Sequence, residues 1–62
     1  MEDIKLLVNN QSVGSITIDT DGNIVNVFVH KTTEDSIKTI VDNQNLIGTK
    51  ISERHYYNLI IN

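Results

Sequence analysis

The sequence of 62 residues contains no cysteine, no proline, no tryptophan and no alanine, and it has only three glycines. The lack of cysteine excludes disulfide bonds and thiolate metal sites, which are two common means of stabilising a very small domain. A chain of this length forms one domain at most, and it buries only about 60% of the surface that its unfolded form exposes. We therefore predict a single domain over residues 1–62, for which association with another chain is the remaining source of extra stability.

Charge is also scarce, and neither sign dominates. Five basic and eight acidic residues give a net charge of −3, which favours solubility but supplies no basic face for a nucleic-acid backbone. No apolar run approaches the roughly 18 residues that a membrane span requires. The acidic start, Met1-Glu2-Asp3, differs from the basic start of a secretion signal. We expect a cytoplasmic protein that contacts no membrane.

Large aliphatic residues are abundant in the sequence. The chain has ten isoleucines, six valines and four leucines. A chain so rich in β-branched residues favours strands, and its many large aliphatics argue against disorder. Eight asparagines beside the ten isoleucines indicate an AT-rich genome, as in low-GC bacteria and their phages.

Three segments predict an antiparallel meander. In residues 4–9, 13–19 and 24–30, apolar residues recur at every second position, as in strands with one buried face. Polar residues 9–12 separate the first two segments. Asp21-Gly22 lies between the second and third, and this pair tolerates the positive φ angles of hairpin turns.

The pattern then changes to that of a helix at about residues 33–44. Ile37, Ile40 and Val41 follow the i, i+3, i+4 spacing of one apolar stripe. Thr32 or Thr33 is the predicted cap of this helix, with acidic residues in its first turn. Gly48 is expected to end the region.

Residues 53–61 fit two structures. As a strand, Tyr57, Leu59 and Ile61 would share one face; as a helix, Tyr56, Tyr57, Ile60 and Ile61 would form a stripe. The aromatic and β-branched residues favour the strand. The predicted fold class is therefore α+β, a three-stranded antiparallel meander followed by one helix and a C-terminal strand at the sheet edge, with a C-terminal helix as the alternative.

The apolar positions that share a face define the predicted core. Its members are Ile4, Leu6, Val8, Ile16, Ile18, Val25, Val27, Val29, Ile37, Ile40, Val41, Leu59 and Ile61. The opposite face of the sheet is expected to carry Leu7, Val13, Ile24 and Phe28. One helix cannot cover both faces, so we expect the second face to meet a partner or a second copy.

Signals for chemistry are weak. His30 and His55 lie far apart in the sequence, and no serine stands in a nucleophile-elbow motif. The three glycines are isolated, which excludes a glycine-rich phosphate loop. Residues 19–23 resemble a calcium loop only in composition, because the glycine and the closing glutamate that such a loop needs are misplaced. We predict no enzymatic activity, no cofactor and no metal.

The densest mixed segment is Glu53-Arg54-His55-Tyr56-Tyr57. Arginine and tyrosine are enriched where protein interfaces concentrate their binding energy, because they combine a large contact area with polar groups. The predicted partner-binding residues are Phe28, Arg54, His55, Tyr56 and Tyr57.

Taken together, these patterns predict a small, non-enzymatic protein-binding module, such as a regulator or inhibitor of phage or mobile-element type. Its partner would be another protein or a second copy of itself, and we expect a homo-oligomer. The alternative is a transcriptional regulator that binds nucleic acid as a dimer. That alternative needs a helical C-terminal segment and clustered lysines, and the net charge disfavours it.

Overall fold

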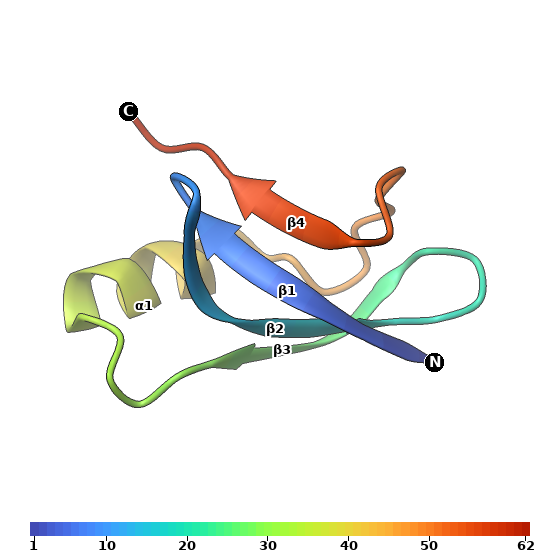
Figure 1. Ribbon diagram of the computed structural model, residues 1–62, viewed down its shortest axis with the longest axis horizontal. Coiled ribbons are helices and arrows are strands. Elements are labelled where there is room, and N and C mark those ends of the chain that lie inside the picture. The colour runs from blue at the N-terminus through green and yellow to red at the C-terminus, as the bar shows by residue number, and fades with distance from the viewer.

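The computed structural model describes residues 1–62 and has one sheet and one helix (Figure 1). The elements are β1 (Glu2–Val8), β2 (Gln11–Ile18), β3 (Ile24–Val29), α1 (Asp35–Asn43) and β4 (Tyr56–Leu59). The strand order is β3-β2-β1-β4, with antiparallel pairing throughout except between β1 and β4, which run parallel. The predicted α+β fold is confirmed, including the C-terminal strand at the sheet edge, and the alternative of a C-terminal helix is wrong.

The two hairpin turns follow directly from their residues. Asn9 and Asn10 join β1 to β2 with φ angles of 48° and 70°, the backbone of a two-residue type I′ turn, which asparagine tolerates well. Between β2 and β3, the amide of Gly22 donates to the carbonyl of Asp19 at 3.1 Å, and Gly22 has a φ of 87°. The hairpin predicted from Asp21-Gly22 is confirmed.

The carboxylate of Asp19 organises the second turn. Its Oδ1 accepts hydrogen bonds from the backbone amides of Asp21 and Asn23, both at 2.9 Å. The bond from the Asn23 amide is the main cause that lowers the pKa of Asp19 below its ordinary value, because hydrogen bonds to a carboxylate favour its charged form. The turn therefore uses this acidic group structurally, within the hairpin.

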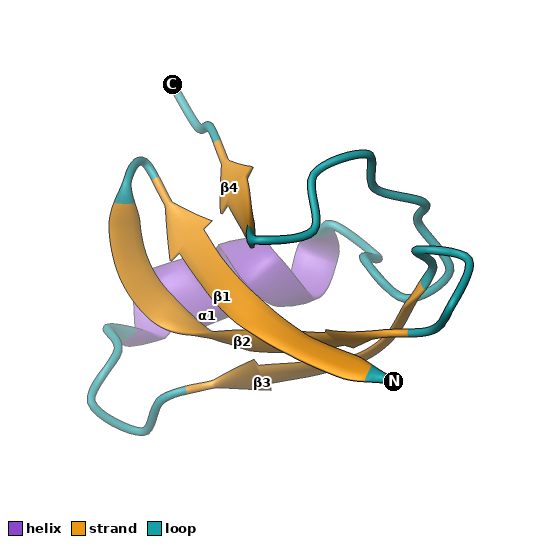
Figure 2. Cartoon of the chain, turned by 45° about the vertical axis from the view of Figure 1, so that its right-hand side comes forward, coloured by secondary structure: helices purple, strands orange, loops and turns teal.

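Helix α1 covers one face of the sheet (Figure 2). It begins after Glu34, whose side chain makes no capping hydrogen bond, so the prediction of a cap at Thr32 or Thr33 is wrong. The hydroxyl of Thr33 instead donates to the carbonyl of Val13 at 3.1 Å. Ile37 packs against the core, but Ile40, a predicted core residue, is only partly buried and lies outside the core cluster.

The core lies between α1 and the sheet. Its buried members are Ile4, Leu6, Val8, Val13, Ile16, Ile18, Ile24, Val41, Leu46 and Ile51. Partly buried residues that pack against them are Val27, Val29, Ile37, Tyr57, Leu59 and Ile61. The strand positions predicted to face the core are thus confirmed in β1, β2 and β4, and in the second half of β3.

A bulge overturns the prediction for the start of β3. Thr17 pairs with Asn26 and Ile18 pairs with Ile24, so Val25 is an extra residue without a partner. A bulge shifts the alternation of side chains by one position. Ile24 is therefore buried at 1% exposure, whereas Val25, a predicted core residue, is 39% exposed.

A second irregularity lies in the first hairpin. Leu6 pairs with Gly14 and Leu7 pairs with Ser12, which leaves Val13 as the extra residue. Val13 consequently turns into the core. Val13 and Ile24 were both expected on the second face of the sheet, and the structure places both in the core, so that face is less apolar than predicted.

The connection between α1 and β4 contributes core residues that the sequence pattern did not indicate. Leu46 and Ile51 are both buried. The connection is held to the start of β3, since the Gly48 amide donates to the Ile24 carbonyl at 2.7 Å and the Ile51 amide donates to the Gly22 carbonyl at 3.0 Å. The segment therefore forms part of the packed domain rather than a free loop.

Candidate functional site: the outer face of the sheet

One face of the sheet has no helix on it, and we call it the outer face. Its side chains alternate along each strand with those that enter the core. The residues of the outer face are Asp3, Lys5, Leu7, Ser15, Thr17, Asn26, Phe28, His30, Tyr56, Asn58 and Ile60. The fold therefore presents a surface four strands wide.

Pairing between the strands aligns four of these residues in one row. Phe28 lies opposite Ser15, Ser15 opposite Lys5, and Lys5 opposite Tyr56. Adjacent strands are about 4.8 Å apart, so the two aromatic residues are separated by roughly 14 Å. Phe28 is 52% exposed and Tyr56 is 46% exposed. The outer face thus has one accessible aromatic side chain at each edge.

The Phe28 ring is partly held in place by its neighbour. The rings of Phe28 and His30 meet edge to face, with centroids 5.6 Å apart and an angle of 81° between the planes. An aromatic side chain held by such a contact loses little conformational freedom when it is covered.

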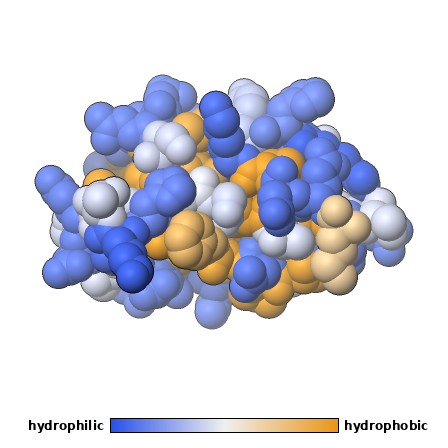
Figure 3. Space-filling view, turned by 60° about the horizontal axis from the view of Figure 1, so that its bottom comes forward, coloured by the Kyte–Doolittle hydropathy of each residue, from blue (hydrophilic) through white to orange (hydrophobic).

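Seen from the side on which β3 lies in Figure 1, apolar side chains reach the surface in patches separated by polar ones (Figure 3).

Charge is depleted on the outer face. Asp3 and Lys5 are its only acidic and basic residues apart from His30, and Oδ1 of Asp3 accepts a hydrogen bond from the Thr17 hydroxyl at 2.6 Å. The other acidic residues lie elsewhere, at Glu2, Asp19, Asp21, Glu34, Asp35, Asp42 and Glu53. Hydroxyl, amide and aromatic side chains make up most of the surface, a composition typical of protein-binding surfaces.

The five predicted partner-binding residues do not form one patch. Phe28 and Tyr56 share the outer face, on opposite edges of the sheet. Tyr57 packs against the core instead, because successive residues of a strand point to opposite faces. The sequence could not join Phe28 to Tyr56, since only the strand register places them in one row.

Arg54 and His55 lie in the loop before β4. Nη2 of Arg54 donates to the carbonyl of Thr20 at 3.0 Å, so this arginine fastens the loop to the second hairpin. His55 is exposed; its amide donates to Oε1 of Glu53 at 3.0 Å, and its Nε2 lies 3.9 Å from the same oxygen. Neither residue belongs to the strands that form the outer face.

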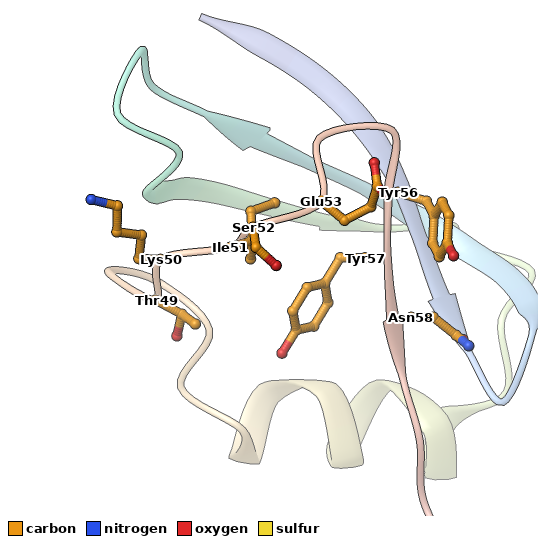
Figure 4. A pocket seen from close by; sticks show the side chains of 8 residues that line it. All are labelled: Thr49, Lys50, Ile51, Ser52, Glu53, Tyr56, Tyr57 and Asn58. Carbon is orange, nitrogen blue, oxygen red and sulfur yellow. The ribbon is translucent and has the colours of Figure 1, made fainter.

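A hollow of about 480 Å³ lies beside β4 (Figure 4). Its lining residues are Thr49, Lys50, Ile51, Ser52, Glu53, Tyr56, Tyr57 and Asn58. In Figure 4, the Tyr57 ring points into the hollow and Tyr56 points away from it, on the other side of β4. The lining is mostly polar and the hollow opens to solvent, whereas small-molecule sites are enclosed and mainly apolar.

In comparisons with known proteins, no family model, no curated protein and no solved structure matches this chain. The chain forms no group of three or more potential metal ligands. Its one helix is too short to cross a membrane. Function is therefore inferred from the outer face and the strand edges themselves.

Proposed function

We propose that this protein is a small, non-enzymatic binding module that recognises a protein partner through the outer face. The observation that supports the proposal is the charge-depleted, uncovered sheet face with Phe28 and Tyr56 exposed at its two edges. A role as a cytoplasmic regulator or inhibitor of phage or mobile-element type stays a prediction from composition.

The energetics of such a surface favour the proposal. Binding energy at protein interfaces concentrates in a few large side chains, with aromatic residues prominent among them. Phe28 and Tyr56 are rigid compared with lysine or glutamate, so ordering them costs little entropy. Ser15, Thr17 and Asn26 between and beside them can adapt their hydrogen bonds to a partner.

The alternative of a nucleic-acid-binding regulator has less support. It requires a helical C-terminal segment, whereas that segment is strand β4. Lys5 is the only lysine on the outer face, and Lys38 on α1 donates to the carbonyl of Lys31. A gel-shift titration at low salt is the test of this alternative, and we expect no complex at micromolar protein.

Replacing Phe28 by aspartate is the test of the proposed surface. Once a protein partner has been isolated by its binding to the wild-type protein, its affinity for Phe28→Asp can be compared. We expect this substitution to raise the Kd for the partner by about 30-fold or more, the loss typical of a hot-spot residue. We expect little change in the unfolding temperature, because Phe28 is half exposed and lies outside the core. Calorimetric titration measures the first quantity and a circular-dichroism melt the second.

Ile47→Asp is the matched control for that experiment. Ile47 is also an exposed apolar residue, at 59% exposure, but it lies in the connection after α1, beside Val41 and Leu46. The control should bind the partner as the wild type does. Equal Kd values for Phe28→Asp and the wild type would refute the outer face as the binding surface.

A further inference from the structure

The free edge of β4 is the least protected part of the sheet. β4 is the end strand, and no other segment lies beyond it in Figures 1 and 2. Tyr56 to Asn62 contain no charged residue and no proline. Natural proteins usually guard edge strands with charges, prolines, bulges or covering segments, because an unpaired edge is a template for another strand.

The other edge of the sheet carries such guards. β3 has the bulge at Val25. The Ile24 amide donates to the Thr49 carbonyl at 2.9 Å, the Gly48 amide donates to the Ile24 carbonyl, and Asn23 forms a bridge with Lys50. The connection before β4 thus covers the start of β3, so the two edges differ in how readily they accept a further strand.

The hydrogen bonds to β1 show which backbone groups β4 leaves free. The Asn9 amide donates to the Leu59 carbonyl at 2.9 Å, and the Ile61 amide donates to Oδ1 of Asn9 at 2.8 Å. In a parallel pair, alternate residues turn their N–H and C=O groups to the same neighbour. Residues 57, 59 and 61 therefore face β1, and Tyr56, Asn58 and Ile60 turn their backbone groups to the free edge.

These three residues are spaced for pairing with a copy of themselves. An antiparallel arrangement about a two-fold axis at Asn58 places Asn58 opposite Asn58 of the second copy. It also places Tyr56 opposite Ile60 of the second copy, and Ile60 opposite its Tyr56. Every residue with free backbone groups then meets another, and each aromatic residue meets a β-branched one, a favourable cross-strand pair.

The side chains on the two faces agree with this register. On the outer face, Ile60 is 62% exposed and Tyr56 is 46% exposed, so both have surface to bury. On the inner face, Tyr57 would lie opposite Leu59 of the second copy, beside the hollow that Tyr57 lines. No like charges meet along the pair, because the segment has none, although each copy carries a net charge of −3.

We propose that two copies of this chain associate by antiparallel pairing of their β4 strands, which joins two four-stranded sheets into one continuous sheet. Both helices lie on one side of that sheet, and the two outer faces merge into one surface on the other. The Tyr56 and Ile60 pairs occupy its centre, and Phe28 lies near each distant edge. Assembly of this kind needs no foreign partner, so the proposal stands apart from the proposed function.

Sedimentation equilibrium of the wild-type chain over a micromolar to high-micromolar series tests the pairing. We expect the mass to rise with concentration from the 7.0 kDa of one chain to twice that value. Ile60→Lys should raise the dimer Kd by about 30-fold or more, because the two-fold axis repeats the contact between Ile60 and Tyr56, and the substitution removes both copies of it. Ile60→Pro, which removes an outward N–H, should act in the same direction.

Val25→Lys is the matched control at the opposite edge, and it should leave the dimer Kd unchanged. Phe28→Asp should also leave it unchanged, which separates self-association from partner binding. A wild-type chain that stays at 7.0 kDa throughout the series would overturn the proposal. So would a dimer that Val25→Lys dissociates and Ile60→Lys does not, since this would place the contact at β3.

Discussion

Replacing Leu6 by alanine is expected to remove about 3 kcal/mol from the free energy of unfolding, since large-to-small core substitutions cost roughly 2–5 kcal/mol. Leu6 is 0% exposed and lies in β1, which is paired on both sides. A domain of this size has a total stability of only about 3–9 kcal/mol. Leu6→Ala should therefore remove a third or more of the total stability, which urea unfolding followed by circular dichroism will measure.

The next residue provides the control for this substitution. Leu7 is chemically identical but points to the outer face and is only partly buried. Leu7→Ala should cost less than about 1 kcal/mol, because it leaves no closed cavity in the core. If the two variants lost equal stability, the assignment of the inner and outer faces of β1 would be wrong.

Replacing Gly14 by alanine is expected to destabilise the protein by about 3 kcal/mol, at the upper end of the cost of overpacking. A Cβ atom at Gly14 would overlap the carbonyl oxygen of Phe28 and would lie 2.9 Å from Cα of Val29. Both are backbone atoms of the paired strand, so neither can rotate away. Relief requires β3 to move from β2, which urea unfolding should record as a large loss of stability.

Gly48→Ala separates this overlap from the general effect of replacing a glycine. A methyl group at Gly48 would meet no atom within 4 Å, but the φ of Gly48 is +90°. The strain of a left-handed conformation costs about 1–2 kcal/mol. We expect Gly14→Ala to be clearly the more harmful, and the reverse order would contradict the close approach of β2 and β3.

The order and type of the elements could be predicted from the sequence because each has a clear local signal. Period-two alternation marked the strands, and the spacing of Ile37 and Val41 marked the helix. The parallel partner of β4 was not predictable in this way. Its position depends on contacts between distant residues, such as the bond from Nδ2 of Asn9 to the carbonyl of Ile61 at 2.9 Å.

The bulges explain the errors that the predicted core makes within the strands. In residues 24–30, both alternating sets are apolar, since Ile24 and Phe28 alternate with Val25, Val27 and Val29. Alternation alone therefore could not show that one residue is inserted at Val25. An extra residue in a strand moves the residues before it to the other face, which the sequence pattern does not reveal.

The candidate site was predictable only in part, because the sequence pattern does not show which residues of different strands share a face. Phe28 was predicted from its place on the second face of the sheet, and residues 54–57 because arginine and tyrosine are enriched at protein interfaces. Of these residues, Phe28 and Tyr56 lie on the outer face. Strand alternation and the bond from Arg54 to the second hairpin separate the sequence neighbours Arg54, Tyr56 and Tyr57 in space.

Site-specific photocrosslinking in the cell tests the outer face most directly. A photoreactive amino acid would replace Phe28 on the outer face, and in a second variant it would replace Asp42, which is exposed on α1. We expect a discrete adduct with one protein partner from position 28 and none from position 42. An adduct that forms from position 42 and not from position 28 would show that the helix side, and not the outer face, meets the partner.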